Sequence, residues 1–226
     1  MKDIFSQIKI EINPHLFLKD PMTSELGKNI LNGSIHLIDE LGFESFNFKK
    51  LALEIGTTEA SVYRYFESKN KLLLYLINWY WGGVATTLLF ETQNIESPEI
   101  RLKKAIHIFT TIPCPETNSV LNNEVALKTI VINECSKVLF TKEVDDVNRE
   151  GVFSVYKKIV QYVASIILEI NRNYKYPNML VSSMIEGSNQ QRFFAEHLPR
   201  LTNSDVAKDT VEAFYLDLIF KAIKND

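Results

Sequence analysis

Two short helical segments joined by a glycine-containing turn lie in the stretch LALEIGTTEASVYRYFESKNKLL, which begins at Leu51. Leu51, Ala52 and Ile55 fit the apolar face of the first segment, and Gly56 ends it. Thr58 has the hydroxyl that favours an N-cap, so a second short helix is expected directly after it. Two helices arranged in this way are typical of a helix-turn-helix, whose second helix enters the major groove of DNA.

Helical periodicity continues along the whole chain and strand signals are scarce, so the sequence predicts an all-α protein. Residues that favour N-caps, together with glycines and prolines, mark the expected helix ends. The candidate N-caps are Ser24, Asn47, Thr58, Ser68, Ser97 and Ser204, and Gly42 is expected to stop the first helix. The expected helices cover residues 24–41, 47–55 and 59–65, a long stretch from 68, then 97–113, 119–140, 141–170, 177–198 and 205–224.

Composition excludes several classes of protein. The chain has 226 residues, of which 46% are hydrophobic, and its formal net charge is −3, so contact with nucleic acid must come from a local patch. Two cysteines and four scattered histidines provide neither a disulfide framework nor metal-ligand spacing, and this cysteine usage suits a reducing cytoplasm. The sequence contains no glycine-rich phosphate loop, no G-x-S-x-G and no H-E-x-x-H, so neither an enzyme nor a cofactor or metal site is expected.

One stretch approaches the length of a membrane span. Residues 72–90 contain no charged residue and no histidine, and a span needs about 18 to 20 apolar residues. There is no second stretch of this kind and no polybasic flank, which favours a helix buried within a bundle over a membrane-anchored protein. The apolar run is also interrupted by Asn78, Gly82, Gly83, Thr86 and Thr87.

The second helix of the motif carries the expected DNA contacts. Side chains near its start should reach base edges, and hydroxyl, phenol and ammonium groups around it should bind phosphates. A helical hairpin with its aromatic residues in the core is the alternative at this point. The expected base-facing residues are Glu59, Ala60, Ser61 and Arg64. The expected phosphate contacts are Tyr63, Tyr65 and Lys69, joined by Asn47 and Thr58 at helix N-termini.

From about Glu25 to Leu76 the sequence resembles the DNA-binding domain of the TetR family of bacterial transcriptional regulators. The matching features are Ile30-Leu31, Gly33-Ser34, Gly42-Phe43, Leu51-Ala52, Gly56, Val62-Tyr63, Tyr65-Phe66 and Lys69 before Leu72. The resemblance implies an N-terminal arm (1–22), a three-helix DNA-binding domain (23–70) and a larger helical domain for ligand binding and dimerisation (71–226). It further implies a cytoplasmic homodimer that binds a palindromic operator, as a repressor, and responds to a small molecule.

Two residues depart from the family pattern. Thr57 stands where an apolar residue is usual, and Glu59 stands where a lysine is frequent. From Ser24 to Lys71 six basic residues oppose seven acidic ones, a net charge of −1, so nonspecific DNA binding should be weak. These departures leave open a helical small-molecule-binding or interaction protein that has lost specific DNA binding.

The terminal helix is apolar nearly all round, which requires both a core and a partner. A monomer that covers this helix fully is the alternative. The expected dimer contacts are Ser183, Gly187, Val211, Phe214, Leu218 and Ala222. An effector pocket needs an apolar lining with a few polar groups, although the same residues could equally serve as ordinary packing. The candidates are Trp79, Phe109, Tyr156, Tyr162, Met184 and Phe193, with His107 and Glu186 as orienting polar groups.

Overall fold

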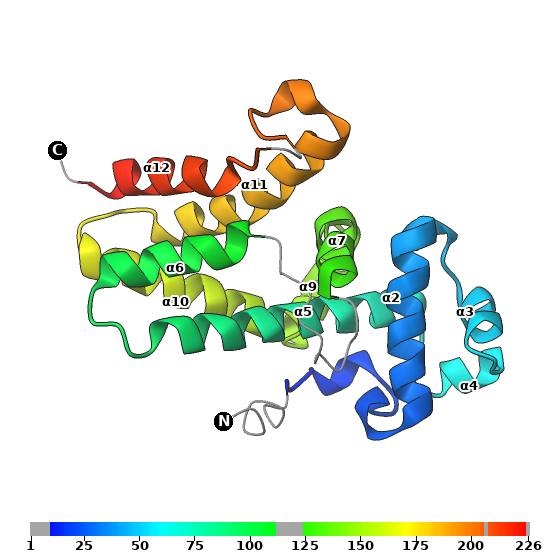
Figure 1. Cartoon of the computed structure of the whole chain (residues 1–226). Coiled ribbons are helices and arrows are strands. Elements are labelled where there is room, and N and C mark those ends of the chain that lie inside the picture. Colours follow the sequence, from blue (N-terminus) through cyan, green and yellow to red (C-terminus); the bar gives the residue numbers. More distant parts are fainter. Residues whose placement is uncertain (1–9, 112–123, 206–207, 225–226) are drawn as a thin grey trace. The chain divides into compact units, whose positions relative to one another are not determined.

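The computed structural model describes residues 10–111, 124–205 and 208–224, and every regular element in these ranges is helical, which confirms the predicted all-α class (Figure 1). The 3-10 helices are η1 (Pro14–Leu16), η2 (Pro21–Thr23) and η3 (Pro199–Leu201). The α-helices are α2 (Glu25–Ser45), α3 (Phe48–Glu54), α4 (Glu59–Tyr63), α5 (Lys69–Thr92), α6 (Pro98–Thr110), α7 (Glu124–Glu134), α8 (Ser136–Leu139), α9 (Val144–Arg149), α10 (Ser154–Ile170), α11 (Pro177–His197) and α12 (Val211–Ile223).

The chain divides into two compact units. Unit 1 takes its described residues from Met1–Gly83 and Pro113–Ser154, and unit 2 takes them from Val84–Ile112 and Val155–Asp226. The helix α5 contributes residues to both units, so the division falls within this helix rather than at its start. Unit 1 therefore combines the helix-turn-helix with α7, α8 and α9, a grouping that differs from the predicted ranges 23–70 and 71–226.

The first helices of unit 1 begin where the sequence places their caps. The side chains of Ser24, Asn47 and Thr58 accept hydrogen bonds from backbone N–H groups three residues further on. Each such bond satisfies one of the four N–H groups that a helix start leaves without an intrahelical partner. The turn between α3 and α4 contains Gly56 at a φ of 66°, a left-handed conformation that glycine adopts without strain. These local rules explain why the predicted caps are confirmed.

The residues before α2 pack on the same unit. Leu16 is fully buried, and the backbone N–H of Leu18 donates to the carbonyl oxygen of Tyr65 at 2.8 Å. The ring of Phe17 meets the ring of Tyr75 edge-on, with 6.0 Å between centroids. The described part of the predicted N-terminal arm is therefore tied to the end of α4 and to α5 by packing and by a backbone hydrogen bond.

In unit 2, α12 packs on α6 and α11. The helix α6 begins as predicted, because Ser97 caps it and Pro98 occupies its first position. The helix predicted for 141–170 is instead interrupted by Gly151, at a φ of 80°, and forms α9 and α10. The last helix begins at Val211 rather than at residue 205, and Ser204 Oγ accepts from the N–H of Thr210 at 3.1 Å.

The helix predicted for 119–140 is divided into α7 and α8, and its predicted start lies outside the described residues. The predicted stop at Pro113 also lies outside them.

Of the helices in the described ranges, α5 is long and apolar enough to cross a membrane by length and composition. Within its most apolar 18-residue window, 56% is buried inside the chain itself. The side chains of Leu72, Leu73 and Leu76 are fully buried in unit 1, as expected of a core helix.

Candidate nucleic-acid interface

The short helix α4 presents a compact set of side chains to solvent. Glu59, Ala60, Tyr63 and Arg64 are exposed, whereas Val62 is fully buried and anchors the helix to the core. Arg64 is the residue that ends α4, which places its guanidinium near the end of the exposed face. The predicted base-facing residues therefore lie together on one accessible element.

The hydroxyl groups at the start of α4 bind one another. Thr58 Oγ1 accepts from the N–H of Ser61 at 3.2 Å, and the two side-chain hydroxyls lie 2.9 Å apart. Ser61 is half-buried in this arrangement, whereas Thr58 is exposed. Both residues consequently stabilise the helix start, and Thr58 also remains accessible from solvent.

Aromatic packing fixes α4 against α3. The ring of Phe48 meets the half-exposed ring of Tyr63 edge-on at 5.0 Å, and it also meets the ring of Phe46 edge-on at 6.3 Å. Phe46 and Phe48 are themselves buried. The position of Tyr63 therefore depends on the residues that lead into α3.

A groove of about 530 Å³ runs along α3 and the turn into α4. The predicted contacts Asn47 and Glu59 line this groove together with Lys49 and Lys50, two lysines that the sequence analysis did not predict as contacts. Their helical spacing, opposite the buried Phe48, Leu51 and Ala52, was the available signal. Leu53 is 84% exposed beside them. The full lining is Asn47, Lys49, Lys50, Ala52, Leu53, Thr57 and Glu59.

Tyr65 was predicted to bind phosphate, and the structure gives it a packing role instead. It is only 4% exposed, and its hydroxyl lies 2.8 Å from Ser24 Oγ. The hydrogen bond with Ser24 lowers the pKa of the Tyr65 phenol, with a smaller contribution from the ammonium of Lys19, which lies 5.1 Å from the ring centre. The residue ties α2 to the end of α4.

Lys69 was also predicted to bind phosphate, and its ammonium is engaged within the protein. Its Nζ donates to the carbonyl oxygens of Phe43, Glu44 and Phe46 at 3.0, 3.2 and 3.2 Å. The same ammonium lies 4.6 Å from the centre of the Phe43 ring. These contacts satisfy carbonyl groups at the end of α2, so they replace the predicted phosphate contact with a structural one.

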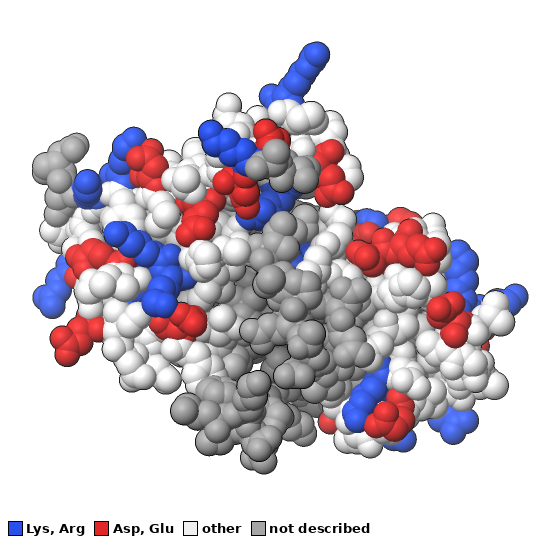
Figure 2. All heavy atoms as spheres, in the orientation of Figure 1, with Lys and Arg blue, Asp and Glu red and all other residues white. Residues whose placement is uncertain are grey.

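The charge around the motif is mixed. On the face shown in Figure 2, basic and acidic side chains alternate over the part of the view where Figure 1 places α2, α3 and α4. This pattern agrees with the net charge of −1 between Ser24 and Lys71. Attraction of DNA phosphates should therefore be local and modest.

The eight candidates for an effector pocket are divided between the two units. Tyr156 donates from its hydroxyl to Glu186 Oε1 at 2.7 Å, and the hydroxyls of Tyr162 and Thr92 lie 2.7 Å apart. Trp79 belongs to unit 1, where it stacks on a neighbouring tyrosine, and the other seven belong to unit 2. Phe109 and Met184 are core residues, and Phe193 is partly exposed beside His197.

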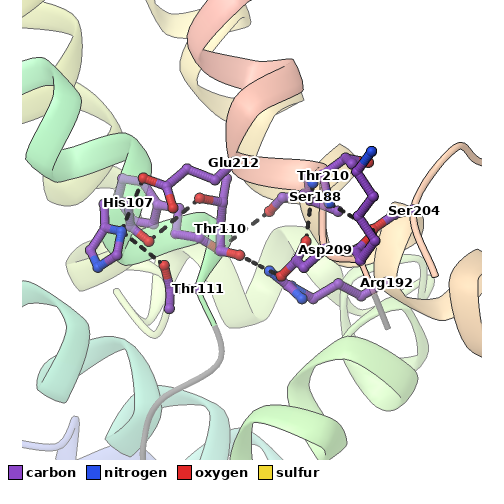
Figure 3. A network of polar contacts seen from close by, with 12 residues as sticks. His107, Thr110, Thr111, Ser188, Arg192, Ser204, Asp209, Thr210 and Glu212 are labelled. Carbon is purple, nitrogen blue, oxygen red and sulfur yellow. Dashed lines mark hydrogen bonds and ion pairs between the residues drawn. The ribbon is translucent and has the colours of Figure 1, made fainter. Parts of the chain in front are cut away.

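His107 lies in a surface network rather than in an enclosed pocket (Figure 3). Its Nδ1 is 3.0 Å from Glu212 Oε1 and 3.1 Å from Thr111 Oγ1, and the side chain is exposed. In the same network the guanidinium of Arg192 contacts the carbonyl oxygen of Thr110 and lies 2.8 Å from Asp209 Oδ2. The network thus joins the ends of α6 and α11 to the start of α12.

The carboxyl group of Asp209 carries the clearest electrostatic effect of this network. Partial burial raises its pKa, but hydrogen bonds from Arg192 and from the backbone N–H of Val211 together lower it by more. The net pKa lies below the ordinary value for aspartate. The ionised form of Asp209 is therefore favoured by folding.

The six predicted dimer residues separate into two groups. Phe214 is 52% exposed and Leu218 is 42% exposed, and Ser183 and Ala222 are also exposed. Val211 is only 2% exposed and belongs to the core of unit 2, which contradicts its prediction as an interface residue.

Gly187 also packs within its own unit. A side chain at this position would collide with the hydroxyl of Tyr215, so the glycine admits Tyr215 from α12. That packing accounts for the small residue without a second chain. Among the described residues no group of three or more His, Cys, Asp or Glu side chains could hold a metal ion.

Comparison with known proteins agrees with this geometry. The family model for "Bacterial regulatory proteins, tetR family" matches residues 30–76, the segment from α2 to α5. No curated protein matches the sequence.

Solved structures share the fold over most of the chain at low sequence identity. AibR, in complex with isovaleryl coenzyme A and operator DNA, is 17% identical with a TM-score of 0.59, over 84% of this chain and 96% of that one. The TetR-family transcriptional regulator PfmR from Thermus thermophilus is 14% identical, with a TM-score of 0.59 over 87% and 99%. The superantigen PfiT is 16% identical, with a TM-score of 0.60 over 92% and 100%.

Proposed function

The chain is a member of the tetR family of bacterial regulatory proteins, a family of DNA-binding regulators and not of enzymes, and we propose that it is a ligand-responsive repressor. In this proposal a cytoplasmic homodimer binds a palindromic operator. Each protomer places α4 in the major groove of one half-site. A small molecule that binds the helices after residue 70 then releases the DNA.

The exposed face of α4 supports the operator contact. Arg64 has the donor geometry that suits the acceptors of guanine, and Ala60 permits close approach of the helix. Tyr63 and the N-caps Asn47 and Thr58 offer donors to phosphates on either side. Lys49 extends this contact along the groove, in place of Tyr65 and Lys69, whereas the ammonium of Lys50 donates to the carbonyl oxygen of Ser45 at 2.8 Å.

The exposed apolar residues of α12 support the dimer. Phe214 and Leu218 lie one helical turn apart and are accessible on the helix, and Ser183 of α11 is exposed as well. Two copies of α11 and α12 would form a four-helix interface that covers these side chains. A dimer of this kind is required for two recognition helices to read a palindrome.

The response to a ligand rests on family resemblance and on the helical region after α4. AibR was solved with both isovaleryl coenzyme A and operator DNA, so its fold combines the two activities. A ligand can release DNA when it binds more tightly to a conformation whose recognition helices no longer fit adjacent grooves. Polar pairs such as Tyr156 with Glu186 could orient such a ligand in unit 2.

A selection of bound sequences from random DNA duplexes tests the proposed operator. The expected product is a palindrome whose half-sites are about one helical turn apart, and the salt dependence of binding should be shallow. A dimer in light scattering at micromolar concentration is expected in the same preparation. Recovery of no preferred sequence by a folded dimer would contradict operator binding.

A second candidate is a helical interaction protein without specific DNA binding. The carboxylate of Glu59 at the exposed start of α4 favours it, since a carboxylate repels phosphate. The superantigen PfiT shows that this fold occurs in a protein described by another function. The same selection separates the two candidates, because this one predicts no enriched sequence.

A further inference from the structure

The loop 43–46, which is the short last turn of α2 beyond its kink together with Phe46, is held by side chains from α5 and α7 as well as by Lys50 of α3. It begins after Gly42, whose φ of 73° kinks α2, and it leads to Asn47, the N-cap of α3. The Lys69 ammonium of α5 binds three of its carbonyl oxygens. The backbone N–H of Phe43, at the start of the loop, donates to a carboxylate oxygen of Glu134 in α7.

Glu134 is well placed to act on this loop. Its Oε1 accepts from the N–H of Phe43 at 3.2 Å, although the two residues are 91 positions apart in sequence. The side chain is 9% exposed, and the helix that carries it packs against α2. A hydrogen bond to a charged acceptor in such a buried position is costly to remove, because the N–H would be left without a partner.

Lys137 joins the same carboxylate to the loop a second time. Its Nζ lies 2.7 Å from Glu134 Oε2 and 3.3 Å from Glu44 Oε1. The contact between Lys137 Nζ and Glu134 Oε2 is an ion pair. Side chains of α7 and α8 therefore contact both Phe43 and Glu44.

A continuous set of ring contacts leads from this loop to α4. Phe46, the last residue before the α3 N-cap, meets Phe48 edge-on at 6.3 Å, and Phe48 meets Tyr63 edge-on at 5.0 Å. Phe46 and Phe48 are buried, so a shift of the loop cannot be absorbed without moving the rings. The position of Tyr63 thus depends on where Glu134 holds the loop.

We infer that Glu134 is a positioning residue for DNA recognition, which acts from α7 through the loop 43–46 and the Phe46–Phe48–Tyr63 rings to set α4. The inference rests on the proposed DNA binding. It assigns to α7, far outside the helix-turn-helix in sequence, a direct part in the sequence preference of the regulator. Glu134 itself does not touch DNA in this account.

The test uses the full-length chain and two duplexes, one selected by the wild type and one of random sequence. The measured quantity is the ratio of their dissociation constants. Glu134→Ala removes the acceptor and should reduce this ratio about tenfold, with the random duplex bound as before. Glu134→Gln keeps an oxygen for the N–H of Phe43 and should stay within about threefold of the wild type.

Two further measurements separate positioning from stability. Hydrogen exchange at the Phe43 amide should accelerate in Glu134→Ala and not in Glu134→Gln. Glu143→Gln, at the exposed residue before α9, removes one negative charge nearby in the sequence. It should change neither the ratio of dissociation constants nor the exchange rate at Phe43. If Glu134→Ala fails to fold, Glu134→Asp can replace it, because it withdraws the carboxylate by one methylene. This variant should show the same reduction in the ratio of dissociation constants.

Each result bears on the inference. The inference is wrong if the wild type distinguishes the two duplexes and Glu134→Ala keeps the same ratio of dissociation constants, although exchange at the Phe43 amide is faster. Equal weakening toward both duplexes, in proportion to the unfolded fraction, overturns it as well, because that is the signature of a purely structural residue. A wild type that does not distinguish the two duplexes overturns the proposed function, and this inference with it.

Discussion

The ammonium group of Lys69 lies 3.0 Å from the carbonyl oxygen of Phe43 and 4.6 Å from the centre of the Phe43 ring. One side chain at the first position of α5 thereby closes the end of α2, whose last carbonyl groups have no partner within the helix. The same residue type at the same place in the sequence could serve a phosphate equally well. Only the fold distinguishes the two roles.

Replacement of Lys69 by alanine should therefore lower the free energy of unfolding by about 2 kcal/mol, since three carbonyl groups lose a charged donor. The slope of DNA affinity against salt should remain that of the wild type. Denaturant titration and binding at three salt concentrations measure the two effects. Lys49→Ala is the matched control, because this exposed lysine of the groove should leave stability unchanged and flatten the salt slope.

Arg64 should contribute to sequence preference. Arg64→Ala removes the guanidinium at the end of α4 and should cost about 1–3 kcal/mol at the selected duplex, with preference relaxed at one position of each half-site. Arg64→Lys keeps the charge but loses the two-pronged donor, so it should lose the preference and retain the salt slope. Binding-site selection with both variants measures this. An unchanged consensus in Arg64→Ala would show that α4 does not read bases through this residue.

The sequence predicts local features of this chain well. Ser24, Asn47, Thr58 and Ser97 cap helices as expected, because an N-cap involves only residues two or three positions away. The break at Gly151 was missed, since the apolar periodicity continues through it. Helix existence was thus predictable, and helix continuity was less so.

Contacts between residues that are distant in the sequence could not be predicted from local sequence patterns. Tyr65 is bound by Ser24, 41 residues earlier, and the contact of Glu134 with Phe43 spans 91 residues. Val211 shares the helical spacing of Phe214, yet one is a core residue and the other is exposed. Apolar periodicity identifies a face, and only the packed neighbours decide whether that face is covered.

The contrast within α12 gives a paired prediction for the dimer. Leu218→Asp should convert the dimer to monomers while each chain remains folded, because the new charge would be buried only in the interface. Val211→Asp should instead unfold the chain, since Val211 is 2% exposed within its own unit. Light scattering and circular dichroism distinguish the outcomes. A folded dimer of Leu218→Asp would place the interface elsewhere.

Acid should weaken the network at the start of α12. The pKa of Asp209 is lower in the folded chain than its ordinary value, so the stabilisation is complete above about pH 4 and is lost as the pH falls through the lowered pKa. Asp209→Asn should make the free energy of unfolding less dependent on pH as the pH falls below about 4. Denaturant titrations across this window measure the difference. Asp217→Asn, on α12 itself, controls for the loss of one negative charge.

The carboxylate of Glu59 leads to two opposite expectations for DNA binding. It occupies the first turn of α4, where a carboxylate favours the helix dipole, and it also lines the groove beside Lys49 and Lys50. If Glu59 accepts a hydrogen bond from cytosine, Glu59→Gln should reduce discrimination at one base pair while affinity for random duplexes rises. If it only opposes phosphate attraction, Glu59→Lys should tighten binding to every duplex and steepen the salt slope, with the selected sequence unchanged. We expect the second result, because a carboxylate near phosphates is unfavourable unless a donor meets it. Selection from random duplexes with the wild type and both variants measures the difference, and a cytosine preference present in the wild type alone would overturn this expectation.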